Sequence, residues 1–362
     1  MFNFIFQFIM CFLVTNLSFH QPFTLQEPLE KNEVVIVETI LSPLNNSFDC
    51  HSSSILALNK NKLITAWKGG PGNGKCNIDM KNKVGIWITH GDSHAWEAPR
   101  LVIEAIDSVC WSPVLSKGPE NEILLFYRKG PNPRELKHFI KRSYDEGLTW
   151  SNEEELPKGV LAPTSKPILL DNHLICPTSL EIGEIQDNDK STACFIEIFS
   201  KNKWGPSTSI QIPGKPFGAL GPSLFYLNDH LVMLCRDRSN KIGLEGWIWF
   251  SKSFDHGVTW QHLKKTNLPN PDSGICALSL PNGKALVIYN HSHTHRKPLN
   301  IAISNDGENW QPTLTLEDNN GEFPSATIDN EGFLHITYAY ITPGKEQRVI
   351  KYVKIDTSKL TK

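Results

Sequence analysis

Short apolar runs that end in polar or charged residues recur along the chain at a nearly constant interval. Each run holds four or five mostly apolar residues, which is too few for a helix but enough for a strand buried on both faces. Asparagine, aspartate or glycine stands just before every run, as expected of tight turns. The runs start 60, 51, 57, 54 and 49 residues apart and cover 63–68, 123–128, 174–179, 231–236, 285–290 and 334–339.

A further strand is predicted before each run and another after it. The preceding strands fall at 52–58, 112–115, 166–170, 222–227, 274–280 and 324–329, and the following ones at 84–89, 138–143, 193–200, 246–251, 299–304 and 348–354. No useful length of sequence shows the 3.6-residue period of an amphipathic helix. Six units of about four strands, each roughly 50 residues long, predict an all-β, six-bladed β-propeller with four-stranded antiparallel blades. A β-sandwich array is the alternative, but these units are too short to be separate sandwiches.

One string marks the turn after the third strand of two units. It reads Ser-x-Asp-x-Gly-x-Thr-Trp and stands at 143–150 and 253–260, with a shortened copy at 304–310 and a remnant at 89–96. The Ser and Asp side chains can accept backbone N–H groups, glycine supplies a positive φ, and tryptophan buries a large ring. These roles are structural, so we interpret the string as scaffold and expect each fourth strand to begin at its tryptophan.

Composition excludes some function classes. The 362 residues carry a formal net charge of −2, which argues against the positive field of a nucleic-acid-binding protein. Seven cysteines follow Cys11, without a Cys-x-x-Cys motif, so we expect no metal site and no cofactor. If the chain is exported, Cys50–Cys76 and Cys176–Cys194 are the pairs nearest in sequence that a disulfide could join.

The amino terminus predicts export. Residues 1–19 are assigned to a signal peptide because the run from Phe2 to Phe19 is almost wholly apolar. No lysine or arginine precedes Lys31, so a short membrane anchor is the alternative. Residues 20–48 then form a leader with a strand at 34–37 that closes the first or the last unit, and residues 49–358 form the propeller.

The repeated turn string resembles the Asp-box, or BNR repeat, of sialidases, and the count of six units matches their fold. Other phrases resemble the BNR-repeat-like branch of the sialidase (neuraminidase) superfamily. This resemblance covers the chain after about residue 48, and its phrases stand at 111–115, 166–167, 177–181, 268–274, 289–290 and 335–338. It implies a glycan as partner and the chemistry of a glycoside hydrolase.

Topology decides which side chains can meet. The Asp-box turns lie on one face of a propeller, whereas the starts of the first strands and the loops after the second strands lie on the other, where ligands are expected. Charged residues end several apolar strands there, and arginine suits a planar carboxylate. We expect Arg128, Arg236 and Lys166 to point into one central cavity. The predicted substrate-binding residues are Lys68, Arg128, Lys166, Arg236, Asn290 and Arg296.

The resemblance also implies catalytic roles. Sialidases hold the sugar carboxylate with three arginines and use an Asp acid together with a Tyr nucleophile paired with a Glu, which meets the two demands of glycoside cleavage. The candidates here are Arg128, Arg236 and Arg296 for the carboxylate, Glu181 with Tyr338 or Tyr340 for the pair, and Asp272 for the acid, with Asp79 as its competitor.

Two departures limit the resemblance. The Arg-Ile-Pro motif of well-known sialidases is absent, since residues 49–54 contain no arginine, and Cys276 stands where the branch commonly has an aspartate. Specificity for sialic acid therefore does not follow. We predict a secreted, monomeric, sialidase-like exo-glycosidase acting on a terminal acidic sugar. The alternatives are an inactive glycan-binding propeller and another polysaccharide-processing enzyme.

Overall fold

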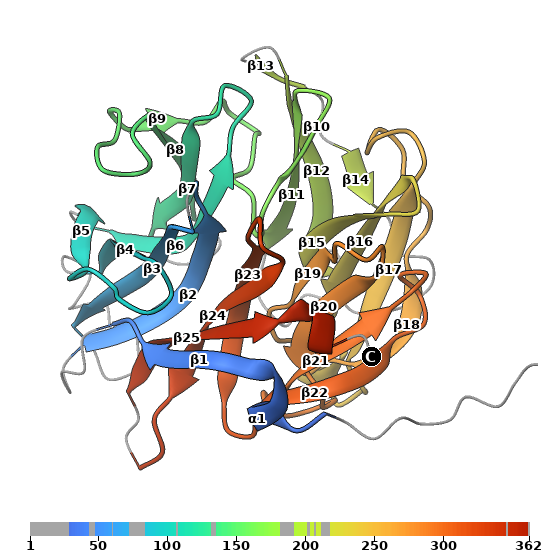
Figure 1. Ribbon diagram of the computed structural model, residues 1–362. Coiled ribbons are helices and arrows are strands. Elements are labelled where there is room, and N and C mark those ends of the chain that lie inside the picture. Colours follow the sequence, from blue (N-terminus) through green and yellow to red (C-terminus); the bar gives the residue numbers. More distant parts are fainter. Residues whose placement is uncertain are drawn as a thin grey trace, which may run out of the picture.

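Six antiparallel sheets surround a central axis, so the predicted six-bladed all-β propeller is confirmed (Figure 1). The structure is a computed structural model that describes residues 29–42, 48–59, 61–71, 84–105, 108–131, 135–181, 192–200, 203–205, 208–210, 218–344 and 347–360. The innermost strand of each blade lines the axis, and the next two strands along the chain follow outward from it.

The blades follow one another along the chain. Blades 1 to 3 are β2–β5 (Phe48–Ala57, Leu63–Pro71, Gly85–Gly91, Arg100–Ile103), β6–β9 (Val109–Lys117, Ile123–Gly130, Lys137–Ser143, Glu154–Glu155) and β10–β14 (Ile168–Leu170, His173–Glu181, Thr192–Ser200, Lys203–Trp204, Thr208–Ile210). Blades 4 to 6 are β15–β18 (Leu220–Leu227, His230–Arg236, Trp247–Ser253, Lys264–Pro269), β19–β22 (Cys276–Ser279, Ala285–Asn290, Leu299–Ser304, Gln311–Glu317) and β23–β25 (Gly321–Ile328, Phe333–Ile341, Arg348–Asp356) with β1 (Val35–Ile40).

Helices are few and short. They are α1 (Lys31–Val34), η2 (Ser239–Ile242) and η3 (Thr357–Lys359). Within the part of the chain that the structure describes, no helix is long and apolar enough to cross a membrane.

The amino-terminal strand closes the ring. β1 pairs antiparallel with β25 and becomes the outermost strand of blade 6, so the strand expected near 34–37 completes the last unit and not the first (Figure 1). The two ends of the described chain also meet, because Lys359 Nζ donates to the carbonyl of Glu33 at 3.0 Å.

Apolar side chains are buried between blades. The described residues form six hydrophobic clusters, one between each pair of neighbouring blades. The fifth position of each predicted apolar run is fully buried there, and its occupants are Trp67, Tyr127, Thr178, Cys235, Tyr289 and Tyr338. Burial on both faces explains why these strands read as continuous apolar runs rather than alternating ones.

The Asp-box turns have the predicted structural role. Asp145 Oδ1 accepts the N–H of Thr149 at 2.9 Å, and Ser143 Oγ accepts that of Gly147 at 2.8 Å. Hydrogen bonds from Thr149 and Ser143 lower the pKa of Asp145 to about 2. Gly147 has φ +89°, and an added Cβ would lie 2.4 Å from Ile64 Cδ1. The turn therefore requires glycine both for its backbone and for its packing against blade 1.

The fourth strands differ from expectation. β22 begins directly after Trp310, but β5, β9 and β18 each begin four residues after the corresponding tryptophan. In those three blades irregular backbone lies between the tryptophan and the strand, so the ring anchors the turn without starting the strand.

The described cysteines are not bridged. Cys50, Cys110, Cys176, Cys194, Cys235 and Cys276 are buried free thiols. The suggested Cys176–Cys194 bridge is therefore absent, and Cys76, the suggested partner of Cys50, lies outside the described residues. Cys194 instead contacts Cys235 of the next blade, and that contact and burial raise the pKa of the Cys235 thiol.

Candidate functional site

A cavity of about 580 Å³ lies on the propeller axis, and all six innermost strands contribute to its lining. Four of them, β2, β6, β15 and β23, have a β-bulge near their start. Ser52, Ser112, Gly221 and Phe323 stand at these bulges with φ of +51°, +38°, +60° and +51°. A positive φ is unfavourable for residues other than glycine, and such strain concentrates at functional sites. The bulges mark the point where these strands enter the cavity.

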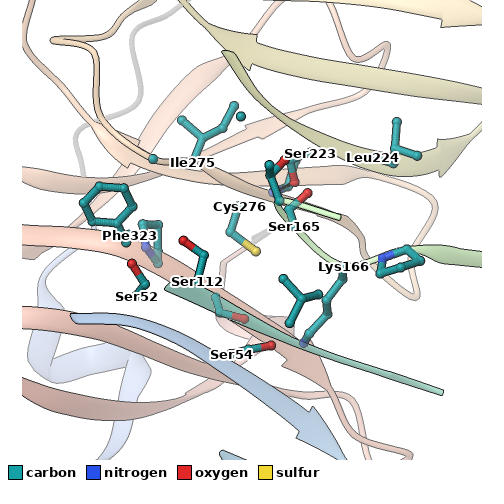
Figure 2. Close-up of a pocket in the computed structure, with 18 of the residues that line it drawn as sticks. Ser52, Ser54, Ser112, Ser165, Lys166, Ser223, Leu224, Ile275, Cys276 and Phe323 are labelled. Atoms are coloured by element: carbon teal, nitrogen blue, oxygen red, sulfur yellow. Dashed lines mark hydrogen bonds between the residues drawn. The ribbon is translucent and has the colours of Figure 1, made fainter. Parts of the chain in front are cut away.

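Hydrogen bonds between innermost strands form the cavity wall. In three of these strands, β2, β15 and β23, a serine at one register accepts a backbone N–H of the next blade. The pairs are Ser54–Leu115 at 2.9 Å, Ser223–Ala277 at 2.9 Å and Ser325–Ile55 at 3.3 Å. Cys276 occupies the same register in β19, and Figure 2 shows it among the serines that line the cavity. Burial raises the pKa of its thiol, despite opposing effects from Lys166 and the N–H of Ala326.

Lys166 reaches across the cavity. It lies just before β10 in blade 3, and its Nζ donates to the carbonyl of Ala326 in blade 6 at 2.6 Å. Blades 3 and 6 are opposite each other in a six-membered ring, so this side chain spans the axis (Figure 2). Burial lowers the pKa of Lys166 to about 8, with a small opposing effect from Cys276.

Arg128 lines the same cavity at the end of β7. Its Nη2 donates to the carbonyls of Pro163 at 3.0 Å and Ala162 at 3.4 Å. Burial lowers the pKa of Arg128 to about 10, which leaves it a cation at neutral pH. His138, on the neighbouring strand, accepts the N–H of Ala162 at Nδ1, 2.9 Å away. Burial and the charge of Arg128 lower the pKa of His138 to about 4.

Two further arginines share one acceptor, and one of them, Arg236, lines the cavity. Arg236 Nη1, at the end of β16, donates to the carbonyl of Asp272 at 2.7 Å, and Arg296 Nη2 donates to the same oxygen at 3.1 Å. Both guanidinium groups also lie over the Phe323 ring, at 5.8 and 5.5 Å from its centroid. The Asp272 carboxylate is 3.3 Å from Arg236 and within 4 Å of Arg238 and Lys241. It is an ion-pair partner of three cations.

Glu322 extends this row to a third arginine. Its Oε2 is 3.4 Å from Arg296 Nη1, 4.0 Å from Arg348 Nε and 3.7 Å from His51 Nε2. Burial raises the pKa of Glu322, but His51, Arg296 and Arg348 together outweigh burial and lower it to about 2. Burial keeps the pKa of His51 below its ordinary value, so the ring is neutral at pH 7. Arg236, Arg296 and Arg348, from blades 4, 5 and 6, are called the arginine row below.

Several predicted site residues lie away from the cavity. Tyr338 is fully buried between blades 5 and 6, and its hydroxyl donates to Glu317 at 3.3 Å. Tyr340 packs against the same cluster under the Lys351 ammonium. Asn290 is fully buried and donates to the carbonyl of Gly321 at 3.0 Å. None of the three lines the cavity as described.

Lys68 does not line the cavity as described but contacts Trp111, which does. Its Nζ lies 3.9 Å from the centroid of the Trp111 ring, and Trp111 lines the cavity with its Nε1 donating to the carbonyl of Gly130 at 3.1 Å. Two other predictions cannot be placed. The side chain of Glu181, at the end of β11, and the whole of Asp79 lie outside the described residues.

Arg128, Lys166 and Arg236 therefore line one cavity, as expected, and Asp272 joins Arg236 to Arg296 beside it. Sequence reasoning missed Glu322, Arg348 and His51. His51 and Glu322 precede the positive-φ residues of β2 and β23, so aligning the four innermost strands that have a bulge would have revealed both. No signal in the sequence singled out Arg348.

Comparison with known proteins places this geometry in a family. The BNR repeat-like domain model matches residues 61–336. A protein of unknown function from Dyadobacter fermentans has a similar structure at 15% identity and a TM-score of 0.72, with 89% of this chain and 98% of that chain covered. No curated protein matches the chain.

Two enzymes of known activity share the fold. The Streptococcus pneumoniae sialidase NanB matches at 11% identity and a TM-score of 0.65, over 88% of this chain and 72% of that chain. The Penicillium chrysogenum α-L-arabinanase, solved with arabinobiose, matches at 16% identity and a TM-score of 0.65, over 90% and 99%. At these identities the likeness shows the fold alone. Because the family model spans more than half of the sequence, the chain belongs to the BNR repeat-like domain family.

Proposed function

We propose that the cavity binds a glycan through a terminal sugar that carries a carboxylate. The arginine row is the observation that supports this proposal. Three guanidinium groups from three blades lie side by side, linked by the Asp272 carbonyl and the Glu322 carboxylate. A guanidinium fork binds a carboxylate with two parallel hydrogen bonds. The existing partners also fix the orientation of the side chains, which reduces the ordering cost of binding.

The size and lining of the site suit a sugar. A volume of about 580 Å³ is within the ordinary range for small-molecule sites. Phe323 and Trp111 offer aromatic surface, and the serines of the innermost strands offer hydroxyl groups. This combination of apolar faces and polar groups matches the faces and hydroxyls of a pyranose.

Binding to arginine is tested directly by calorimetry. Arg236→Gln and Arg296→Gln should each weaken binding of a uronate- or sialate-terminated oligosaccharide about 10- to 100-fold, since a hydrogen bond to a charged group contributes roughly 1.5–3 kcal/mol. Arg100→Gln is the matched control, because this arginine donates to the carbonyls of the Asp-box turn at 147–148. Unchanged affinity in both cavity variants would refute the proposal.

Hydrolysis of the bond to that sugar is the second candidate function. It is favoured by the family and by the glycosidases that share the fold. Cleavage requires a proton donor and a second group that stabilises the transition state. Asp272 is held by three cations and Tyr338 is buried, so the carboxylates that remain from the prediction are Glu181 and Asp79.

A panel of fluorogenic glycosides, sialosides and uronides included, separates the two functions. If the chain is a hydrolase, wild type releases the fluorophore, and Glu181→Gln lowers kcat at least 100-fold, which is the usual contribution of an acid–base group. Binding by calorimetry without release of any fluorophore would leave the chain as a glycan-binding propeller.

We also propose export, on the basis of the apolar run at 2–19. Expression of the full chain in a secreting host, followed by amino-terminal sequencing, should show cleavage near residue 19. An intact amino terminus retained with the membrane fraction would instead support the anchor.

A further inference from the structure

A histidine and a serine from consecutive positions of β2 both line the cavity. Adjacent residues of a regular strand point to opposite faces, so His51 and Ser52 would normally be separated. A β-bulge follows His51, and Ser52 has φ +51°, and with this backbone both side chains reach the cavity. Figure 2 shows Ser52 among the polar side chains of the lining. Bulges beside functional sites commonly redirect a side chain in this way.

The contacts of the His51 ring determine where its proton lies. Nδ1 is 2.7 Å from Ser52 Oγ, and Nε2 is 3.7 Å from Oε2 of Glu322. The pKa of Glu322 is about 2, so this group is a carboxylate at neutral pH and can only accept. The ring proton is therefore on Nε2, and Nδ1 accepts the hydroxyl of Ser52. A hydroxyl, a base and a carboxylate follow one another, as in a serine hydrolase.

His51 has the protonation state that a general base needs. Burial is the main cause of its lowered pKa, and the charges of Lys68 and Arg348 lower the pKa further against the opposing effect of Glu322. The ring is neutral at pH 7 and can take a proton. Its contact with Glu322 is longer than a hydrogen bond, and such contacts commonly shorten when a substrate is bound.

The arginine row lies next to this group. The Phe323 ring packs against His51 with 4.5 Å between the ring centroids, and the same ring lies under the guanidinium groups of Arg236 and Arg296. Attack of a hydroxyl on a carbonyl carbon places negative charge on the carbonyl oxygen, and fixed cations nearby stabilise that charge. A sugar whose carboxylate is bound by the row would also have its other substituents close to Ser52.

We propose that Ser52 and His51, positioned by Glu322, hydrolyse an acyl ester carried by the bound sugar. Ser52 Oγ bonds to the ester carbonyl carbon while His51 Nδ1 takes the hydroxyl proton. The bond from that carbon to the sugar oxygen then breaks, and the sugar oxygen takes the proton from His51. Water gives a proton to His51, bonds to the same carbon and releases the carboxylic acid, and the proton returns to Ser52. The sugar as carrier of the ester rests on the function proposed above, whereas the nucleophile rests on the contacts of Ser52 and His51.

The nucleophile is tested first with a fluorophosphonate probe, which bonds to an activated serine and releases fluoride, followed by peptide mass spectrometry. Ser52 should be labelled in wild type, about 100-fold more slowly in His51→Gln, and position 52 should carry no label in Ser52→Gly. Glycine is chosen because it adopts the positive φ without strain. Ser112→Gly is the matched control, since Ser112 stands at the equivalent bulge of β6 with φ +38° and lines the cavity, but follows Trp111. An unlabelled Ser52 in wild type, or equal rates in wild type and His51→Gln, would overturn the proposal.

The second test measures the acetate released from an O-acetylated uronate disaccharide. Wild type and Ser112→Gly should release acetate at the same rate, and kcat/KM should fall at least about 100-fold in Ser52→Gly and His51→Gln. Equal release by all four proteins would contradict the assignment. The role of Glu322 is tested by ¹⁵N NMR of the His51 ring, since Glu322→Gln should remove the preference for the Nε2 proton and lower kcat more than it changes KM. An unchanged ring proton in this variant would show that Glu322 does not position His51.

The two proposals fail in different ways. Binding of the uronate disaccharide by calorimetry, without labelling of Ser52 or release of acetate, would overturn the esterase and keep the proposed function. Labelling of Ser52 that depends on His51, without binding of any acidic sugar, would overturn the proposed function and keep the nucleophile.

Discussion

The buried cations in and beside the cavity form two groups: some have a carboxylate partner, and others have only carbonyl partners. On the side of blades 4 to 6, each arginine of the row stands beside a carboxylate, Asp272 or Glu322. Arg128 of blade 2, and Lys166, whose ammonium reaches from blade 3 to blade 6, have only carbonyl partners among the described residues. Paired arginines are oriented by the fold and support it, whereas buried cations without a carboxylate partner weaken the fold. The difference can be tested by stability as well as by binding.

The largest effect is expected from Glu322→Gln. This change leaves Arg296 and Arg348 without a shared counter-charge and should lower the free energy of unfolding by about 2–3 kcal/mol, less than the ~3–5 kcal/mol of a fully buried pair. The pKa of Glu322 is about 2 when folded and ordinarily 4.5, so its contribution is complete above pH 4.5 and disappears as the pH falls toward 2. Denaturant unfolding across this range measures both effects.

Glu104→Gln provides the control, because Glu104 is exposed and remote from the row. If Glu322→Gln unfolds with the same free energy and the same acid dependence as this control, the ion pairs of Glu322 do not stabilise the fold.

A smaller effect in the opposite direction is expected from Lys166→Met, which should raise the free energy of unfolding at neutral pH. The pKa of Lys166 is about 8 when folded and ordinarily 10.5, so between these values the unfolded chain binds more protons and wild-type stability rises with pH. That rise should be roughly 1–3 kcal/mol and should vanish in the variant. Denaturant unfolding at pH 7, 8.5 and 10 compares Lys166→Met with Lys264→Met, an exposed lysine of β18. Parallel pH profiles for wild type and Lys166→Met would contradict the unpaired charge.

The smallest expected effect is on the pKa of His138, a neighbour of Arg128. Burial lowers the pKa of His138, and the charge of Arg128 lowers it further, to about 4 in all. In Arg128→Gln the His138 pKa should rise by less than one unit and stay below 6.5, because the burial remains. Ring signals of His138 followed by NMR against pH measure this change, with exposed His262 as an internal reference. No movement would mean that the charge of Arg128 is already balanced.

The fold could be predicted from the sequence because the same unit is repeated six times. Part of the candidate site could also be predicted, from the positions where the second strands end. Charged residues at the ends of second strands were expected to reach the axis, and Arg128 and Arg236 line the cavity. Tyr338 was assigned from a predicted strand end, but β24 continues to Ile341, so this residue stays inside the strand and is buried between blades 5 and 6.

The rest of the candidate site depends on contacts between residues far apart in the chain, which no local sequence motif predicts. The pairing of Glu322 with Arg296 and Arg348 joins residues 26 positions apart in either direction, and it exists only when blades 5 and 6 are packed. The reach of Lys166 to Ala326 likewise requires the closed ring. Such contacts follow from the arrangement of blades around the axis and not from any local run of sequence.

Closure by β1 also sets an order of events during synthesis. The partner of β1 is β25, which ends at Asp356, so the first described strand leaves the ribosome long before its partner exists. Pairing of such distant segments is slow, and the unpaired edges can associate with other chains until it occurs. The cavity also needs blade 6, since Ala326 holds Lys166. A nascent chain therefore has no complete cavity until translation is nearly finished, and a truncation near the carboxyl terminus would abolish both the ring and the cavity.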